Sequence, residues 1–415
     1  MKSSDQYIPQ RLNKCNLVIL NLMAFCLLIT MVSCRPAPPD YTGSRYLIIS
    51  PTALMDSVSD LVTLKTSQGF MVETVTLEAI LTSSSGLDDP EKIRNYLIDY
   101  SEQDTNKAFV LLVGSIETMP MRIAYTDPAD HYTYNVPTDY YYQELTCDWD
   151  LDGDGFYGEW DDDLTKDNCD YKVEVYVGRL PWDSPLDVAK MVETIISYEN
   201  DYSARMKTAI GAAATIVNPC DAATFVNLAK NSYAAISGYH NVSLYEECPS
   251  LNPDFELSRN AFLEQWEALE PGFVAWFSHG NSFGSYYNSY PYTFIDKENI
   301  PQNVKPAIAF TSGCTVGNPE VESLGRILVR EGIAAAFVGA SRETSGGDDL
   351  LPGFMAQFQM GENFILRRQA VAVAIANALE YYIDHEVPID NIPGMAFNQN
   401  IFEFMIYGDP AIQVR

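Results

Sequence analysis

The stretches FVAWFSHGN (residues 273–281) and AIAFTSGCTVG (residues 307–317) decide the expected fold. Each is a short apolar run, rich in β-branched and aromatic residues, that stops abruptly at a small or polar residue. Such runs are typical of strands buried on both faces, which belong to parallel α/β sheets. Functional sites in open α/β sheets lie just beyond the carboxyl ends of the strands. His279 and Cys314 therefore fall where a site is expected.

The chemistry of these two residues fits their positions. A cysteine thiolate is a good nucleophile, and a nearby imidazole can take up its proton or stabilise its charge. Gly280 lets a substrate carbonyl approach the backbone, and the amides of Gly280 and Cys314 could form an oxyanion hole. The alternative is structural, because a buried cysteine is usually a small core residue. The sequence has no His/Cys spacing typical of a zinc site.

The rest of the chain predicts an α/β fold. Strands at residues 46–50, 71–77 and 109–114 alternate with amphipathic helices, and this β-α-β-α-β order indicates a parallel sheet. The alternation restarts near residue 205 and includes one long helix from Glu362 to His385. We expect two adjacent three-layer α/β/α subdomains with mostly parallel sheets, over residues 46–204 and 205–415.

The composition limits the possible partners. The formal net charge is −30, and 47% of the residues are hydrophobic. So acidic a surface argues against nucleic acid as a partner and is compatible with a calcium-binding or exported protein. The apolar fraction is sufficient for a large packed core, and the sequence does not indicate an oligomeric state.

An acidic segment, DWDLDGDGFYGE (residues 148–159), interrupts the α/β pattern. Its spacing matches a calcium loop, with Gly153 at the sharp turn and carboxylates at the ligand positions. Position 8 of that loop is Gly155 where an aliphatic residue is usual, and a frame shifted by two residues, ending at Asp161, is an alternative. A solvated acidic loop without metal is another. The expected structural Ca²⁺ ligands are Asp148, Asp150, Asp152, Asp154 and Glu159.

The N-terminus is typical of a targeting segment. Basic residues precede the apolar run LVILNLMAFCLLITMV (residues 17–32), which has the length of a signal-peptide core. Cys34 and the polar stretch after it resemble a bacterial lipoprotein signal. We expect a signal peptide over residues 1–33, lipidation at Cys34 and a tether over residues 34–45. The mature chain would then be an exported outer-membrane lipoprotein facing the periplasm or the cell surface; ordinary signal cleavage is the alternative.

The cysteines agree with export. The chain has eight, of which four remain after the signal segment, Cys34 and Cys314 are set aside. An even remainder in an exported protein permits two disulfides. Four cysteines allow three pairings, and the preferred one joins Cys147 to Cys169 and Cys220 to Cys248.

Several sequence blocks resemble a known family. FSHGNSFGSY (277–286) followed by AFTSGCTVGNPE (309–320) is similar to the His-Gly and Cys blocks of the gingipain family of cysteine peptidases, in the caspase-like clan. YLIIS, LKTSQGFMVETVTL, FVLLVGSIETMP, VEVYVGRLP and IYGDPAIQVR resemble further blocks in the same order, so the resemblance spans residues 46–415. It implies a caspase-like second subdomain and a cysteine endopeptidase that hydrolyses proteins or peptides through an acyl-enzyme.

The resemblance also implies a preference for Arg or Lys before the cleaved bond. Asp221 and Glu343, each after an expected strand, are the acids that could pair with such a P1 side chain. The acid that orients the histidine in some family members has no counterpart, because Ile216, Val217 and Asn218 occupy that region. A non-catalytic surface binding protein on the same fold and a transpeptidase therefore remain as alternatives.

Overall fold

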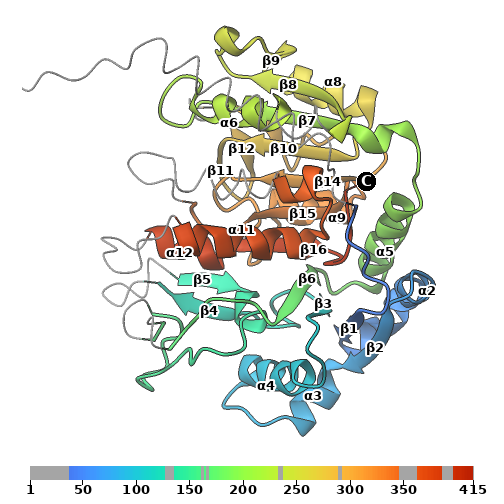
Figure 1. The fold of residues 1–415 in the computed structure, drawn as a ribbon, viewed down its shortest axis with the longest axis vertical. Coiled ribbons are helices and arrows are strands. Elements are labelled where there is room, and N and C mark those ends of the chain that lie inside the picture. The colour runs from blue at the N-terminus through green and yellow to red at the C-terminus, as the bar shows by residue number, and fades with distance from the viewer. Residues whose placement is uncertain are drawn as a thin grey trace, which may run out of the picture. The chain divides into compact units, whose positions relative to one another are not determined.

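A computed structural model describes residues 37–126, 135–159, 163–164, 168–231, 237–287, 292–344, 362–385 and 396–414 (Figure 1). The described residues from Pro38 onward form one compact unit. The predicted signal peptide, Cys34 and Asp161 lie outside the described residues. Within the described residues, no helix has the length and apolar character needed to cross a membrane.

One sheet of eleven strands runs through this unit, in the order β2-β1-β3-β6-β16-β15-β14-β10-β7-β8-β9. The strands that precede residue 205 lie on one side, and those that follow it lie on the other (Figure 1). The strands are β1 (Arg45–Ser50), β2 (Met71–Thr76), β3 (Ala108–Val113), β6 (Val175–Leu180), β7 (Thr208–Ala213), β8 (His240–Tyr245), β9 (Phe255–Glu256), β10 (Phe273–Phe277), β14 (Ala307–Thr311), β15 (Ala334–Ala340) and β16 (Phe404–Gly408).

The direction of the strands reverses once, at β16. This strand pairs with β15 in antiparallel fashion and with β6 in parallel, through Tyr407 and Arg179. All the other pairs in the sheet are parallel. The predicted α/β fold with mostly parallel strands is confirmed, and the two groups of strands join edge to edge in one sheet.

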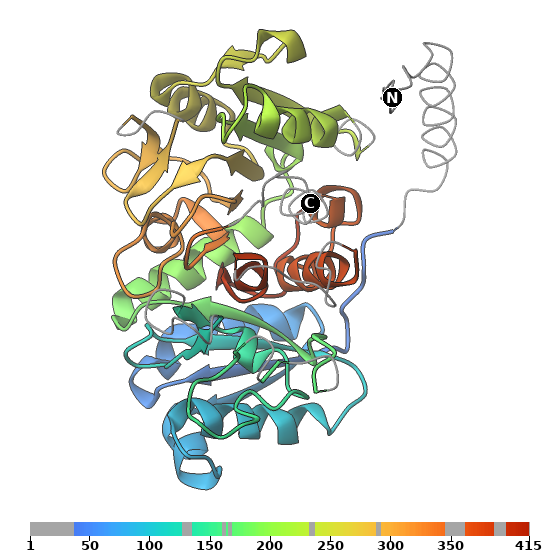
Figure 2. The ribbon, with the colours of Figure 1, turned by 90° about the vertical axis from the view of Figure 1, so that its left-hand side faces the viewer.

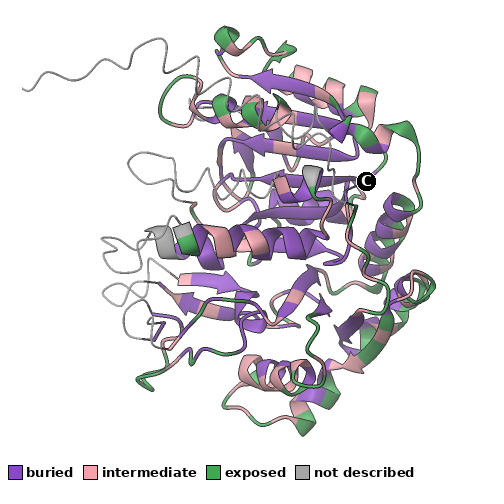
Figure 3. Cartoon of the chain, in the orientation of Figure 1, coloured by how far each residue is buried: buried purple, intermediate pink, exposed green. Residues whose placement is uncertain are grey.

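Four strands of the sheet are buried along their whole length, as the apolar runs predict. Every residue of β1, β3, β14 and β15 is buried (Figure 3). Full burial requires helices on both faces of the sheet. In Figure 2, α11 (Val371–His385, red) and α5 (Pro185–Glu199, green) lie on opposite sides of the strands. α11 packs on β6, and α5 packs on β15.

Polar caps define the starts of several helices. The side chains of Asp88, Ser184 and Ser258 each accept a hydrogen bond from a backbone amide in the first turn of α4, α5 and α8. The helices are α2 (Ser59–Ser67), α3 (Leu77–Ser83), α4 (Asp89–Ser101), α5 (Pro185–Glu199), α6 (Asp221–Ala229), α8 (Arg259–Leu269), α9 (Leu324–Arg330), α11 (Val371–His385) and α12 (Ala396–Phe402), with short 3-10 turns at Thr52–Val58, Tyr140–Tyr142, Ala204–Lys207 and Pro249–Leu251.

The single helix predicted from Glu362 to His385 is wrong. A π-helical turn spans Glu362–Leu366, and α11 begins only at Val371. Between them, Arg368 has a left-handed backbone with φ of 49°, and Ala370 forms an antiparallel bridge to Gln413. The bridge takes the backbone out of the helical path, and periodicity alone does not reveal such a long-range contact.

Two small sheets and two disulfides complete the unit. β11 (His279–Gly280), β12 (Gly284–Tyr286) and β13 (Thr293–Asp296) form one small sheet, and β4 (Arg122–Tyr125) pairs with β5 (Asn135–Thr138). The disulfides join Cys147 to Cys169 and Cys220 to Cys248, the preferred pairing.

Candidate active site

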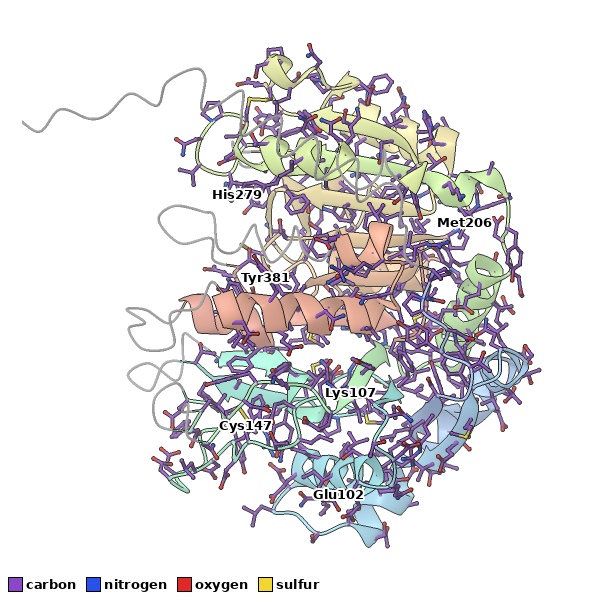
Figure 4. The ribbon with its side chains drawn as sticks, in the orientation of Figure 1. Glu102, Lys107, Cys147, Met206, His279 and Tyr381 are labelled. Carbon is purple, nitrogen blue, oxygen red and sulfur yellow. A yellow bond between two sulfur atoms is a disulfide. The ribbon has the colours of Figure 1, made fainter. Side chains whose placement is uncertain are left out.

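The site is built from the ends of two neighbouring strands. β10 and β14 are parallel partners, with Phe273 opposite Ile308 and Trp276 opposite Thr311. His279 follows the end of β10, and Cys314 follows the end of β14, so the backbone brings both to the same edge of the sheet. Figure 4 shows His279 at this edge.

Gly280 is in close contact with the cysteine segment. A Cβ atom at Gly280 would lie 2.8 Å from a methyl carbon of Val316 and 3.0 Å from both the carbonyl oxygen of Cys314 and the carbonyl carbon of Gly313. No side chain fits at such distances, so glycine is required here by close approach. The His-Gly pair and the Gly-Cys pair are therefore packed backbone to backbone.

His279 is oriented by backbone and ring contacts. Its Nε2 atom lies 2.9 Å from the carbonyl oxygen of Ile216, and its ring stacks on Tyr286 with the centroids 5.9 Å apart. The Tyr286 hydroxyl donates in turn to the carbonyl oxygen of Gly280 at 3.2 Å. The group that orients His279 is thus a main-chain carbonyl. Every residue carries one, so the sequence gives no signal for it.

Cys314 is the one free cysteine in the described part of the chain. Its sulfur lies 3.6 Å from the hydroxyl of Thr344, which donates to the carbonyl oxygen of Ser312 at 2.9 Å. Burial raises the pKa of the Cys314 thiol, and the carboxylates of Glu403 and Glu343 raise it further. The thiol therefore stays protonated at neutral pH until another group accepts its proton.

One amide in the cysteine turn is available to a ligand. The amides of Ser312, Gly313 and Thr315 donate to the carbonyl of Trp276, the hydroxyl of Thr311 and the carbonyl of Arg342. Within the described ranges, the amide of Cys314 has no acceptor. A free backbone donor beside the nucleophile is what an oxyanion hole requires.

The two acids expected to bind a P1 cation differ in their surroundings. The carboxylate of Asp221 accepts backbone hydrogen bonds from residues 216, 217, 218 and 222, so its oxygens are engaged in its own turn. Glu343 precedes Thr344 and acts electrostatically on the thiol of Cys314.

A third acid, Glu403, was not predicted. It is fully buried, and neither carboxylate oxygen has a hydrogen-bond partner in the described structure. Its backbone oxygen accepts from the amide of Ser341, at the end of β15, which places it near the cysteine edge of the sheet. Burial raises its pKa well above that of an ordinary glutamate, the side chain of Gln399 beside it offsets part of this rise, and the charge of Glu343 adds to it. In the sequence, Glu403 directly follows α12, and an acidic residue at the end of a helix gives no indication that it will be buried.

The acidic loop brings carboxylates together in two groups that share Asp152. Asp150, Asp152 and Asp163 form one group, and Asp152, Asp154 and Glu159 form the other, with ligand oxygens within 4.8 Å of one another. Asp148, expected as the first ligand, is in neither group. Burial and the charges of Glu159 and Asp152 raise the pKa of Asp163 to about 6.

Comparison with known proteins decides the family. Residues 40–415 match the model of peptidase family C25. The chain belongs to peptidase family C25. It is a gingipain-family protein and a cysteine-type peptidase, and its substrates are accordingly proteins or peptides. No curated protein matches it.

Solved structures of other proteins share the fold. The crystal structure of the Arg-specific cysteine proteinase gingipain R superposes with a TM-score of 0.68 at 15% identity, covering 92% of this chain and 80% of that one. The complex of the RgpB pro- and mature domains from Porphyromonas gingivalis gives a TM-score of 0.68 at 15% identity, with coverage of 90% and 80%. A structure described only as a protease gives 0.67 at 13% identity, with coverage of 89% and 78%.

Proposed function

We propose that this C25 peptidase is an exported endopeptidase in which Cys314 is the nucleophile and His279 carries the proton. The observation that supports this most is the close packing of Gly280 on the backbone of Gly313 and Cys314. This packing brings together the backbone segments that carry His279 and the free, half-buried thiol of Cys314, at the carboxyl ends of neighbouring parallel strands, and this supports the proposal because α/β sheets carry their chemistry there.

The groups present suffice for acyl transfer. The sulfur of Cys314 attacks the scissile carbonyl carbon while the thiol proton passes to His279. The amides of Cys314 and Gly280 stabilise the oxyanion, and His279 then gives the proton to the leaving amine as the C–N bond breaks. Water hydrolyses the resulting thioester and regenerates the thiol. A raised pKa of the thiol fits a mechanism in which its proton passes to His279 during the attack.

Comparison of the wild type with Cys314→Ala and His279→Gln tests this mechanism. We expect both variants to fold and to lose peptide hydrolysis, measured as release of a fluorogenic group. Hydrolysis by folded Cys314→Ala at the wild-type rate would refute it. Wild-type protein that cleaves no peptide would favour the binding protein, and transfer of the acyl group to an added amine in preference to water would favour the transpeptidase.

We further propose that the enzyme cleaves after Arg or Lys and that Glu403, with Glu343, receives the P1 cation. A buried carboxylate without a partner is costly, and a cationic side chain would satisfy it. Both acids act electrostatically on the Cys314 thiol, and this supports a role for them near the scissile bond.

Peptides that differ only at P1 test this proposal. We expect kcat/KM for Arg over norleucine, an uncharged unbranched side chain, to fall in Glu403→Gln by about 10²-fold, because the charged hydrogen bond is lost. The control is Glu380→Gln, an acid on α11. An unchanged Arg preference in Glu403→Gln would rule out this residue.

We propose that the acidic loop binds a structural calcium ion. Gly155 donates to the carboxylate of Asp150 at 3.0 Å, five residues earlier, which is the spacing of loop positions 1 and 6. This favours the shifted frame, with Asp150, Asp152 and Asp154 at positions 1, 3 and 5. Tyr157 then takes position 8 and forms a β-bridge with Ala124. Asp163 adds a carboxylate beyond the end of the motif.

We propose that the chain is exported and lipidated at Cys34. Two disulfides fit an oxidising compartment, and the N-terminal sequence resembles a lipoprotein signal. Incorporation of labelled palmitate into the wild type and not into Cys34→Ser, followed by fractionation of the envelope, tests the proposal. Equal labelling of both proteins would contradict it.

A further inference from the structure

The turn that carries Ile216 is placed beside His279 by its neighbours. β7 and β10 are parallel partners as far as Ala213 and Phe277, and the amide of Ala214 continues the pairing by donating to the carbonyl of Phe277 at 2.8 Å. The amide of Thr215 then donates to the carboxylate of Glu246 at 2.8 Å. The chain therefore reaches Ile216 alongside the His279 segment.

Beyond Ile216 the turn depends on Asp221. The two carboxylate oxygens accept from the amides of Ile216 at 3.1 Å, Val217 at 2.7 Å, Asn218 at 2.9 Å and Ala222 at 2.7 Å. A carboxylate has about four acceptor positions, so all are used. Val217 is 63% exposed, which means that core packing does not fix the tip of the turn.

A disulfide anchors the far end of the same turn. Cys220 directly precedes Asp221, has a left-handed backbone with φ of 65°, and is bonded to Cys248. The amide of Asp221 also donates to the carbonyl of Asn218 at 3.1 Å. The carboxylate, the disulfide and this bond together hold residues 216–221 in one conformation.

The contact of Ile216 with His279 has a chemical consequence. A carbonyl oxygen only accepts hydrogen bonds, so Nε2 of His279 must carry a proton to meet it at 2.9 Å. In the neutral ring the other nitrogen, Nδ1, is then unprotonated and can accept the thiol proton. A displaced Ile216 carbonyl would leave both tautomers accessible and the ring free to turn.

We propose that Asp221 is a positioning residue for catalysis: by ordering the 216–218 turn it aims the Ile216 carbonyl at His279 and fixes the ring as the Nε2–H tautomer. This rests on the proposed role of His279 as the proton carrier. It gives Asp221 a function different from the P1 binding that the sequence predicted.

The tautomer can be measured without any peptidase activity. The chain has four histidines, and loss of one ring signal in His279→Gln assigns the resonance of that residue in a ¹⁵N–¹H NMR spectrum. In a Cys314→Ala background we expect the Nε2–H form alone when Asp221 is present. Asp221→Ala should show a mixture of both tautomers, and Asp221→Asn, which keeps one acceptor oxygen, should lie between.

Kinetics on proteins that retain Cys314 form the second arm. We expect kcat to fall by about 10²-fold in Asp221→Ala, because a small displacement of a reacting group costs that much, while KM changes less than twofold. Asp221→Asn should lose less. The control is Asp254→Ala, since Asp254 accepts from the amide of Ser243 at 2.8 Å and pairs with Lys230 in the same half of the sheet.

The two arms separate this proposal from the peptidase mechanism. If folded Asp221→Ala keeps the wild-type tautomer, the proposal is overturned whatever the activity. If Asp221→Ala keeps the wild-type kcat, as the control Asp254→Ala is expected to do, the proposal is also overturned. If the wild type cleaves no peptide but Asp221→Ala still shows the mixture of tautomers, the result supports the positioning role of Asp221. It then contradicts only the proposed peptidase mechanism.

Discussion

At the scale of single residues, Glu403 is the buried polar group that most needs a physical explanation. Its carboxylate is fully buried and has no hydrogen-bond partner in the described structure. An isolated buried charge is strongly disfavoured, which is why its pKa is raised well above the ordinary value. We proposed that a P1 cation is the missing partner, and the stability of the free enzyme should then depend on pH through this residue.

We predict that Glu403→Gln stabilises the free protein at pH 8 by about 1–3 kcal/mol, because an amide does not ionise and so avoids the cost of keeping a buried carboxyl group either protonated or charged at that pH. The folded state holds the Glu403 proton more tightly than the unfolded state, so its contribution favours folding at low pH and fades as pH rises through the raised pKa. Urea unfolding at pH 4 and pH 8 measures this. A difference between the proteins that is the same at both pH values would contradict the prediction.

We predict that Gly280→Ala reduces kcat by about 10²-fold without unfolding the protein. The added methyl group would meet the backbone of Gly313 and Cys314 at 3.0 Å and must push the nucleophile away. Gly238→Ala is a control outside the site, because a Cβ atom there has open space around it and the only cost is the left-handed backbone with φ of 72°. Wild-type kcat in Gly280→Ala would show that the two segments are not rigidly packed.

At the scale of elements, the acidic loop is the part whose stability we expect to depend on a bound ion, the calcium proposed above. Carboxylates within 4.8 Å of one another repel strongly unless a cation lies between them. A bound ion stabilises the folded state in proportion to the logarithm of its concentration over its dissociation constant, giving about 2.7 kcal/mol at a hundredfold excess.

We predict that Ca²⁺ raises the melting temperature of the wild type by a few degrees and that Asp152→Asn abolishes this shift, because Asp152 belongs to both carboxylate groups. Asp148→Asn is the matched control, since Asp148 is in neither group, and it should respond like the wild type. If both variants lose the rise in melting temperature equally, the result would favour the loop frame that begins at Asp148. No response in the wild type would exclude calcium.

The elements also differ in how far the sequence predicts them. The buried strands Phe273–Phe277 and Ala307–Thr311 follow directly from their apolar runs, because a short continuous run followed by small residues favours a strand over a helix. The long helix from Glu362 failed because the bridge between Ala370 and Gln413 overrides local periodicity. The Ile216 carbonyl and the burial of Glu403 depend on tertiary packing, and neither leaves a mark in residue type or spacing.

At the scale of the whole molecule, a buried ion cluster ties distant parts of the chain together. Lys65 on α2 pairs with Glu199 at the end of α5 at 3.2 Å and with Asp409 beyond β16. Tyr46 on β1 donates to the same Asp409 at 2.8 Å. Lys65 and Asp409 stand in two of the sequence blocks that resemble the gingipain family, so the blocks meet in space although they lie near opposite ends of the chain.

We predict that Lys65→Met destabilises the protein by about 3–5 kcal/mol, the usual cost of leaving buried carboxylates without their cation. Chemical denaturation of the wild type and the variant measures this loss. Lys190→Met is the control, because the pair of Lys190 with Glu331 is exposed and contributes little. Equal, small losses in both variants would show that the buried cluster adds nothing to the fold.

The measurement that tests the central claim most directly is the intact mass of the protein after reaction with a peptidyl chloromethyl ketone that carries Arg at P1. We expect one adduct, located on Cys314 by peptide mapping, formed much more slowly in His279→Gln and absent in Cys314→Ala. An adduct on another residue, or peptide hydrolysis that persists in Cys314→Ala, would contradict the account.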